Sequence, residues 1–374
     1  MTIHRLAAGT LLAAFAIAGC ARAETESRTV DSSAGKLTVE ERAENLNHPW
    51  GLAFLPDGRL LVTERAGRLR ILGTDGKLSE PLAGVPAVQA RGQGGLLDVA
   101  LDPDFAQNRL VYISFAEPGG EGASSAFARG TLAEGRIDGL KVIFRQQPKV
   151  SGNGHYGGRI VFPPTGHVFL TTGDRQKLDP AQDLMSHLGK VIRLNRDGSV
   201  PADNPFIRST GAKPEIWSYG HRNIQGAAIE PGTGALWTIE FGPAGGDELN
   251  KPEPGKNYGW PLVSWGSHYD GRDIPDPPTR PDLADAVKYW NPTIAPSGMI
   301  FYTGTMFPQW KNNILIAGLG TLGIVRLEIK DGKVVNEERI ELGRRIRDVE
   351  QAPDGSIYVA TDDDDGRLWR LSKK

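Results

Sequence analysis

Apolar residues follow a pattern that recurs along the chain. A short apolar segment is followed by a Pro, Asp or Gly turn and then by alternating β-branched residues, as in PWGLAFLPDGRLLVTER from Pro49. Alternation with a period of two predicts β-strands, and the turn residues predict hairpins between them. Six copies occur, and they begin at Pro49, Gly95, Gly157, Gln225, Ala295 and Arg347.

Several copies continue into a third strand, such as GRLRIL from Gly67 and GKVIRLN from Gly189. Copies begin at intervals at or above the roughly 40 to 50 residues of common propeller blades, which indicates loop insertions in the middle units. Self-similar sheets must stack on their neighbours to bury their apolar faces. The sequence therefore predicts an all-β fold, a six-bladed β-propeller of four-stranded antiparallel blades. A β-sandwich pair is the alternative, although a sandwich does not require this self-similarity.

The first part of the chain predicts its domain organisation. Residues 1–23 have a short basic start, an apolar run and then small residues, which is typical of an export signal with its cleavage region. Residues 24–36 are polar and rich in serine, which predicts a flexible linker. We expect a single propeller domain over residues 37–374, in which residues 37–46 supply the outer strand that closes the last blade.

Two processing sites compete at the end of the signal. Residues 17–20, IAGC, resemble a bacterial lipobox, in which Cys20 would become a lipid-modified N-terminus. Cys20 is the only cysteine of the chain, so it has no disulfide partner, and we favour the lipobox for this reason. Cleavage after Ala23 is the alternative. In both cases we expect a periplasmic protein, with a possible membrane anchor at Cys20.

Charge and composition narrow the range of partners. The chain has 43 basic and 45 acidic residues, and its one notable run of like charge is the four aspartates of residues 362–365. Nucleic-acid binding needs a basic surface, so we expect no nucleic-acid partner. The 47 glycines and 26 prolines are spread through the chain, which indicates many turns and short strands rather than a helical protein.

Polar residues precede the recurring strands at about the same point of each unit. Loops at one end of a propeller converge on its axis, so these residues predict one shared pocket. They are Gln93, His155, Arg222, Asn223, Trp290, Arg345 and Arg347. His155 lies among glycines in SGNGHYGGR, where the backbone can approach a ligand, and its imidazole could act as a general base. The alternative is a histidine that only forms a hydrogen bond with a turn and has no catalytic role.

Residues 215–260 combine donors for an anion with oxygen ligands for a cation. Arg222 lies in this stretch, and a cluster of arginines is costly unless an anion neutralises it. The Gly242-Pro243 turn, the Asp247-Glu248 pair and Tyr258 follow. Calcium takes carbonyl and carboxylate oxygens, so the stretch suggests a metal-plus-anion site. A loop with surface charges is the alternative. The chain has no zinc or phosphate-loop motif.

Eight motifs occur in an order that is specific to one family. They are GQGGLLDVALDPDF, GHYGGRIVF, TTGD, YGHRNIQG, EFGPAGGDELN, NYGWP, PTIAPSG and RRIRDVEQAPDG. From about residue 40 onwards the chain resembles the soluble quinoprotein aldose dehydrogenases, the glucose/sorbosone dehydrogenase family of six-bladed propellers. The resemblance implies an oxidoreductase that oxidises the C1 hydroxyl of aldose sugars to lactones. It also implies the cofactors pyrroloquinoline quinone (PQQ), which accepts the hydride, and calcium.

The resemblance implies roles for the polar residues of the expected pocket. His155 would be the general base that takes the proton of the C1 hydroxyl, and Gln93 would touch substrate or cofactor. The residues that would hold the PQQ carboxylates and carbonyls are Arg222, Asn223, Arg345 and Arg347. Trp290, at the same point of its unit, is a further candidate for cofactor binding.

The resemblance also implies two calcium sites and the partners of the reaction. Gly242 and Pro243 would give main-chain oxygens to the calcium that polarises the quinone, and Glu248 and Tyr258 would help to bind a second calcium. The electron acceptor would be a quinone, a dye or a small redox protein. The long insertions of the dimeric family members are missing, so we expect a monomer.

Two positions depart from the glucose-oxidising members. Gly320 stands where those members have a lysine that pairs with PQQ, and Gly154 stands where they have an acid that contacts the sugar. Two other functions stay open on the residues alone. One is a calcium-dependent lactonase-type hydrolase, and the other is a non-catalytic ligand-binding propeller in which residues 362–365 form only a solvated turn.

Overall fold

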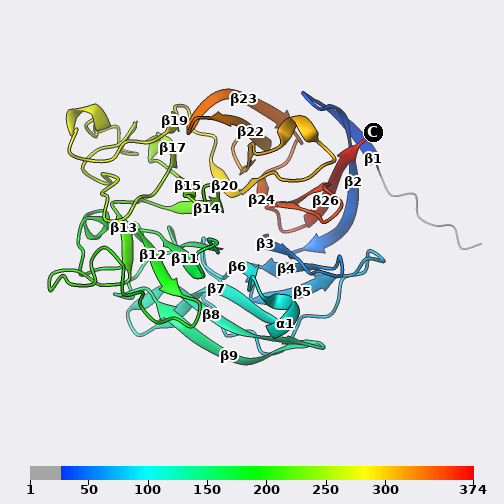
Figure 1. Ribbon diagram of the computed structural model, residues 1–374, viewed down its shortest axis with the longest axis horizontal. Coiled ribbons are helices and arrows are strands. Elements are labelled where there is room, and N and C mark those ends of the chain that lie inside the picture. Colours follow the sequence, from blue (N-terminus) through cyan, green and yellow to red (C-terminus); the bar gives the residue numbers. More distant parts are fainter. Residues whose placement is uncertain (1–26) are drawn as a thin grey trace, which may run out of the picture.

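The computed structural model describes residues 27–374, which form a six-bladed β-propeller (Figure 1). Blade 1 contains β3 (Pro49–Phe54), β4 (Leu60–Glu64) and β5 (Arg68–Leu72). Blade 2 contains β6 (Leu96–Leu101), β7 (Leu110–Gly119), β8 (Gly122–Ala133) and β9 (Arg136–Arg145). Blade 3 contains β10 (Gly157–Val161), β11 (His167–Thr172), β12 (Lys190–Asn195) and β13 (Ile216–Tyr219).

The second half of the ring repeats this order. Blade 4 contains β14 (Ile224–Ile229), β15 (Leu236–Glu240), β17 (Asp247–Asn250) and β19 (Lys288–Trp290). Blade 5 contains β20 (Pro296–Phe301), β21 (Ile314–Gly318), β22 (Gly323–Lys330) and β23 (Lys333–Glu341). Blade 6 contains β24 (Ile346–Gln351), β25 (Ile357–Thr361), β26 (Gly366–Lys373), β2 (Gly35–Leu46) and β1 (Ser27–Ser32).

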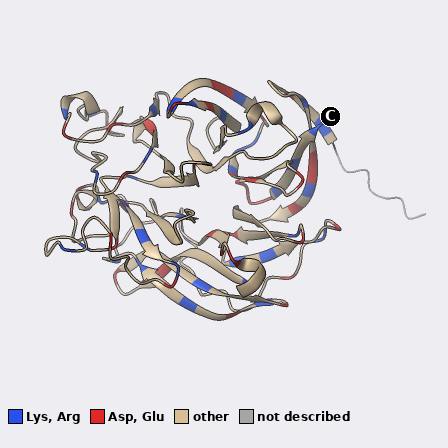
Figure 2. Ribbon diagram, in the orientation of Figure 1, with Lys and Arg blue, Asp and Glu red and all other residues tan. Residues whose placement is uncertain are grey.

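The remaining elements are short. They are the strands β16 (Ala244–Gly245) and β18 (Gly266–Ser267), the helix α1 (Phe105–Asn108), and the 3-10 turns Asp179–Ala181, Pro277–Thr279 and Pro308–Trp310. No helix within residues 27–374 has the length and apolar character needed to cross a lipid bilayer. Figure 2 shows acidic and basic residues interspersed over the blades, in keeping with the balanced composition.

The sequence repeat predicts the inner part of every blade correctly. Each of the six copies forms the innermost strand of one blade and the strand beside it. Every innermost strand packs against that of the next blade, and β24 packs against β3, which closes the ring. The prediction of four strands per blade holds for four blades only, because blade 1 has three strands and blade 6 has five. After β5 the chain runs back along the strand without a continuous ladder: Leu78 bridges to Leu72, and the Ser79 and Leu82 N–H groups donate to the Ile71 and Leu69 carbonyls. Pro81 in this segment has no N–H to donate.

The N-terminal strand closes the ring as the sequence predicts. β2 pairs antiparallel with β26, from Leu37 opposite Lys373 to Leu46 opposite Gly366. The flexible linker expected over residues 24–36 is not what the described part shows, because the chain from Ser27 forms β1 and pairs with β2. Val30 and Ser32 of β1 are partly buried, and the other residues of this strand are exposed. The signal, Cys20 and the cleavage after Ala23 lie outside the described residues.

Apolar side chains between the blades form the core. Trp310, Tyr302 and Phe307 of blade 5 pack against Ile346 and Trp369 of blade 6 in one cluster. Similar clusters join blades 1 and 2 and blades 4 and 5. Burial of this apolar surface is the main force that holds the ring together. The blades therefore form a firm frame, and the loops at the start of the inner strands converge around the axis.

Candidate active site

His155 lies in the loop that leads into β10, and its position is fixed on two sides. The Gln93 side-chain oxygen accepts a hydrogen bond from the His155 backbone N–H at 2.7 Å. Asp174 Oδ1 lies 2.7 Å from His155 Nδ1, and both side chains are buried. The backbone of His155 is left-handed, with φ of 52°, which is uncommon for a non-glycine residue. Because Asp174 binds Nδ1, Nε2 is the ring nitrogen left to react.

The electrostatics of this pair favour a neutral imidazole. Burial lowers the pKa of His155 below its usual value and the nearby Arg222 guanidinium adds to this, while Asp174 opposes it. Burial alone would raise the pKa of Asp174, but hydrogen bonds from His155 and from the Trp260 indole, at 2.8 Å, hold it below its usual value. A neutral imidazole beside an ionised carboxylate can accept a proton.

His155 opens onto a pocket of about 310 Å³. The pocket lies between the loop after β11, the loop between β13 and β14, and the turn that follows β18. The residues that line it are His155, Gln176, Leu178, Arg222, Pro243, Trp260, His268, Tyr269 and Asp270. Aromatic walls with a few polar groups are typical of small-molecule sites. Three predicted site residues, His155, Arg222 and Pro243, therefore meet in one pocket.

Arg222 is a buried cation without a charged partner in the pocket. Its guanidinium donates to the Phe241 carbonyl at 3.2 Å and to the Tyr269 hydroxyl at 3.1 Å, both uncharged groups. It lies over the Trp260 ring, 5.2 Å from its centre, and its buried Nε has no partner among the described residues. A buried guanidinium with spare donors fits an anionic ligand, since burial without one is costly.

A second group of predicted residues is joined to the first by hydrogen bonds. Arg347 is buried and donates to Asp362 Oδ2 at 2.7 Å and to the Gln225 side-chain oxygen at 3.1 Å. Gln225 in turn donates to Asn223 Oδ1 at 3.2 Å, which also accepts from the Gly157 N–H at 3.2 Å. Burial lowers the pKa of Arg347, while Asp362 opposes this. The chain of contacts thus links Arg347 and Asn223 to the strand that follows His155.

Arg345 is less buried than Arg347 and shares its acidic partner. Its side chain is 48% exposed and lies 3.4 Å from Asp362 Oδ2. Asp362 is buried, binds His48 at 3.1 Å as well, and has a pKa far below its usual value; burial opposes this shift and Arg347 is its chief cause. The solvated turn considered for residues 362–365 therefore does not describe Asp362. In this arrangement the protein itself supplies one carboxylate to two arginines.

The Gly242-Pro243 turn offers main-chain oxygens at the pocket. The Gly242 N–H donates to Asp247 Oδ1 at 3.0 Å, and Asp247 Oδ2 accepts from Ile294 and Ala295 at 2.8 Å, so the carboxylate fixes the turn. No described residue donates a hydrogen bond to the carbonyl of Gly242 or of Pro243. Free carbonyl oxygens beside a pocket fit a calcium ion, which prefers such ligands.

Glu248 lies in a second, small cavity of about 10 Å³, just room for one water or ion. The lining includes Arg222, Glu240, Gly242, Gly246, Glu248, Tyr258 and Trp260. Burial, with the Glu240 carboxylate, raises the pKa of Glu248 well above its usual value. A cation between these acids would relieve their repulsion, so the donors fit the predicted second metal.

Tyr258 cannot offer its hydroxyl to that metal. The hydroxyl donates to the Lys251 carbonyl at 2.6 Å and accepts from the Glu253 N–H at 3.1 Å, while the ring stacks on His221 with centres 4.8 Å apart. Only its main-chain oxygen could take part. Within residues 27–374 no three His, Cys, Asp or Glu side chains converge on a point, so any cation here depends on backbone oxygens.

Trp290 is not brought to the pocket. It lies in β19, the outer strand of blade 4, and packs in the core between blades 4 and 5. Its indole N–H donates to Glu337 Oε2 of β23 at 2.9 Å. The expectation that Trp290 shares the position of the other candidates fails because β19 is an outer strand. The inner strand of blade 5 begins only at Pro296.

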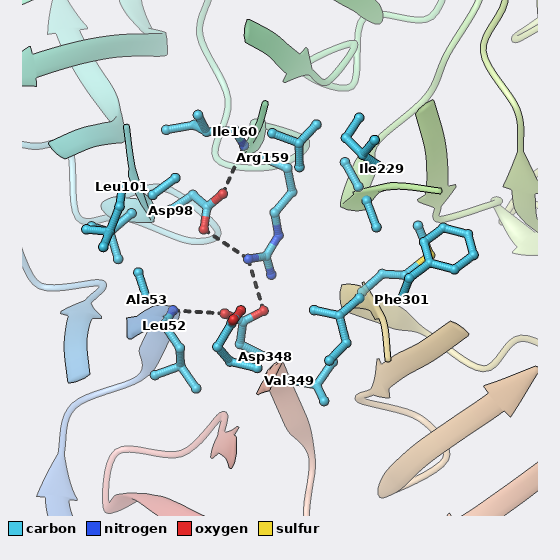
Figure 3. Close-up of a pocket in the computed structure, with 18 of the residues that line it drawn as sticks. Leu52, Ala53, Asp98, Leu101, Arg159, Ile160, Ile229, Phe301, Asp348 and Val349 are labelled. Atoms are coloured by element: carbon cyan, nitrogen blue, oxygen red, sulfur yellow. Dashed lines mark hydrogen bonds and ion pairs between the residues drawn. The ribbon is translucent and has the colours of Figure 1, made fainter. Parts of the chain in front are cut away.

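Another pocket, of about 430 Å³, lies along the central channel and contains no predicted site residue. It is lined by the inner strands of all six blades. Figure 3 shows Arg159 between two acids in it, 3.1 Å from Asp98 and 3.0 Å from Asp348. Leu52 and Ile160 donate backbone hydrogen bonds to these acids at 2.9 Å. We interpret this buried charge cluster as a structural contact that joins the inner strands across the channel.

Several residues of the site escaped the sequence analysis as individual residues. They are Asp174, Gln176, Leu178, Gln225, Trp260, His268, Tyr269 and Asp270. Asp174 and Trp260 lie in the motifs TTGD and NYGWP, but their contact joins positions 86 apart in the chain. The position of Tyr269, which is 76% exposed, carries no sequence signal at all.

Comparison with known proteins agrees with this geometry. The family model described as Glucose / Sorbosone dehydrogenase matches residues 46–370. The aldose sugar dehydrogenase YliI of Escherichia coli is 45% identical over 346 residues, which cover 90% of this chain and 93% of that protein.

Two solved structures share the fold over most of the chain. The apo form of the soluble E. coli aldose sugar dehydrogenase superposes with a TM-score of 0.87 at 44% identity, covering 90% of this chain and 100% of that one. The PQQ-bound aldose sugar dehydrogenase of Streptomyces coelicolor gives a TM-score of 0.75 at 30% identity, covering 90% and 98%.

Proposed function

The chain belongs to the glucose/sorbosone dehydrogenase family, and from this premise we propose that it is a PQQ-dependent aldose sugar dehydrogenase. The reaction is oxidation of the C1 hydroxyl of an aldose to the lactone. One observation carries the proposal: the buried His155–Asp174 pair opens onto a pocket that is also lined by Arg222, whose guanidinium has no carboxylate partner among the described residues. This arrangement places a base and an anion site in one small cavity.

His155 Nε2 takes the proton of the C1 hydroxyl. Asp174 keeps the remaining ring proton on Nδ1 and stabilises the imidazolium that forms, as an acid partner does in other His-based sites. Gln93 holds the backbone of the base in its left-handed conformation. When bound, PQQ supplies the quinone that accepts the hydride, and calcium polarises it. Trp260 and Tyr269 line the pocket beside the Arg222 guanidinium.

The donors present fit both cofactors. Arg222, Arg347 and Arg345 would hold the carboxylates of PQQ, with Asn223 at a carbonyl. Gly242 and Pro243 would give their free main-chain oxygens to a calcium ion. Glu248 and the main-chain oxygen of Tyr258 would be ligands of a second calcium ion. The positive charge of this ion would lower the raised pKa of Glu248.

We extend the proposal to the setting of the enzyme. The mature protein acts as a monomer in the periplasm, with a lipid anchor at Cys20 if the lipobox is used. Electrons leave to a quinone, a dye or a small redox protein. Intact-mass measurement of the mature protein tests the anchor: lipid on Cys20 supports it, and an unmodified N-terminus at Glu24 refutes it.

Reconstitution tests the activity. Purified apoprotein is mixed with PQQ and calcium, and dye reduction is followed across a panel of aldoses. We expect activity only with both components, loss on chelation and recovery when calcium is returned. Lactone hydrolysis that needs calcium but not PQQ would replace this proposal with the hydrolase alternative. Full activity after exhaustive removal of PQQ would exclude the quinoprotein.

A further inference from the structure

The side-chain amide of Gln176 lies directly beside the backbone that carries His155. A Cβ atom built on Gly154 would come 2.7 Å from the Gln176 Cδ, 2.9 Å from its Oε1 and 3.0 Å from its Nε2. Non-bonded atoms do not pack this closely, so the amide occupies the space that a side chain at position 154 would need. Because Gly154 precedes His155, the amide stands next to the base.

The loop that carries Gln176 is held firmly against the base. The Gln176 backbone N–H donates to Asp174 Oδ1 at 2.8 Å, the same oxygen that lies 2.7 Å from His155 Nδ1. The buried Arg175 beside it donates to the Gly152 carbonyl at 2.8 Å. Arg175 and Gln176 both have left-handed backbones, with φ of 54° and 59°. These contacts therefore fix the backbone of Gln176 and leave the donors and the acceptor of its side-chain amide unused.

The Gln176 amide is exposed to the pocket and makes no hydrogen bond with any residue in the described part of the chain. An amide offers two donor hydrogens and an acceptor oxygen, whereas a carboxylate only accepts. We propose that Gln176 is a specificity-determining residue that binds a hydroxyl of the sugar other than the one oxidised. This inference rests on the proposed function and names how this chain selects its substrate.

The amide also predicts a range of substrates. It can donate to one hydroxyl or accept from another, and its flexible side chain can turn to either face of a sugar ring. A site of this kind tolerates aldoses that differ in the configuration of one hydroxyl. A carboxylate fixed at position 154 would discriminate more strongly between such aldoses. A sugar without a hydroxyl in the matching position would leave this buried acceptor without a hydrogen bond, which is costly.

Steady-state kinetics of Gln176→Ala test the contact, with Lys177→Ala as the matched control. Lys177 lies on the same loop, is exposed and does not line the pocket. We expect the KM for aldoses to rise about five- to ten-fold in Gln176→Ala, with kcat within about three-fold and Lys177→Ala unchanged. Titration with PQQ should give equal affinity for all three proteins. An unchanged KM across the panel overturns the inference.

A second variant separates a substrate contact from a structural effect. Gly154→Ala pushes the amide aside without straining the backbone, because Gly154 is not among the positive-φ glycines. It should raise KM as Gln176→Ala does, and the double variant should be no worse than either single one. Additive effects would show that the two residues act separately and would overturn the inference.

Binding without turnover gives an independent readout. The affinity of the PQQ-loaded protein for 1,5-anhydroglucitol, which lacks the C1 hydroxyl, should fall in Gln176→Ala and stay constant in Lys177→Ala. If the unchanged protein shows no PQQ-dependent aldose oxidation, the proposed function fails and this inference falls with it. If it oxidises aldoses and Gln176→Ala binds the analogue equally well, only the inference fails.

Discussion

Neighbouring residues set the pKa and the orientation of the His155 imidazole. An exposed histidine titrates near neutrality, but here burial and Arg222 lower its pKa while Asp174 orients the ring. Seven histidines occur in the chain, and others pair with acids too, such as His187 with Glu215. What distinguishes His155 is the open pocket next to it. The chemistry of the site therefore depends on access as much as on the pair.

Replacement of the base separates its role from cofactor binding. His155→Gln should lower kcat by about two to four orders of magnitude, because the proton of the sugar hydroxyl then has no acceptor. PQQ titration should give nearly the wild-type affinity, since His155 contacts none of the three arginines. Retained turnover at saturating PQQ would mean that the base lies elsewhere.

The pH profile should report the environment of His155. Its lowered pKa means that the imidazole stays neutral below its usual value of 6.5, so activity should be lost only as the pH falls further. Asp174→Asn removes a group that raises this pKa, so the acid limb of kcat/KM should move to lower pH. A limb that stays in place in Asp174→Asn would show that another group titrates.

The arginines should differ in their contribution to PQQ binding. Arg347→Ala should weaken PQQ by about 2 to 5 kcal/mol, because Arg347 is buried, while Arg345→Ala should have a smaller effect because its side chain is 48% exposed. Since Arg347→Ala also removes the chief cationic partner of the buried Asp362, the double variant with Asp362→Ala serves as the folding control. Equal losses in both arginine variants, measured by PQQ titration, would contradict this order.

At the scale of elements, a strand from the start of the domain completes its last sheet. β2 joins β26, and its residues Leu37, Val39 and Leu46 are fully or almost fully buried. Because this strand covers the edge of blade 6 and joins the two ends of the domain, it stabilises the whole ring. β1 adds a fifth strand that the polar, serine-rich sequence did not predict.

Loss of packing on β2 should lower the stability of the whole domain. Leu37→Ala should lower the free energy of unfolding by about 2 to 4 kcal/mol, because it leaves a cavity in the cluster between blades 5 and 6. Glu44→Ala, on the exposed side of the same strand, is the control and should change it by less than about 0.5 kcal/mol. Denaturant unfolding gives both values. A small effect of Leu37→Ala would show that packing of β2 contributes little to the stability of the ring.

For the whole molecule, a buried ion-pair cluster around Arg159 joins the inner strands at the central channel. Arg159 of β10 bridges Asp98 of β6 and Asp348 of β24, and its guanidinium also stacks on Trp50 of β3, 4.1 Å from the ring centre. Its Nε also donates to the Gln225 carbonyl of β14 at 2.7 Å, so five blades meet at this side chain. Figure 3 shows the two acids on either side of it. Burial raises the pKa of Asp348 to about 7, against the attraction of Arg159.

Removal of this cation should destabilise the ring. Arg159→Met should cost about 3 to 5 kcal/mol of unfolding free energy, because two buried carboxylates lose their partner. The triple variant with Asp98→Asn and Asp348→Asn should recover much of this loss, which thermal and denaturant unfolding would measure. No recovery in the triple variant would mean that packing of Arg159 on Trp50, rather than charge, is what matters.

The repeat, the number of blades and the strand that closes the ring could all be predicted from the order of residues. These follow from alternation, turn residues and self-similarity, which are local properties of the chain. The sequence also predicted that residues of converging loops share one pocket, and His155, Arg222 and Pro243 do line one pocket.

Only the tertiary structure decided which of these residues meet and in what state. Trp290 fell in an interblade core, since its strand is an outer one, and Asp362 proved to be a buried ion-pair partner rather than part of a solvated turn. The pairing of His155 with Asp174, and the Gln176 amide in the space beside Gly154, join segments whose contact depends on loop paths. Such contacts depend on distances between loops, and the order of residues along the chain does not contain those distances.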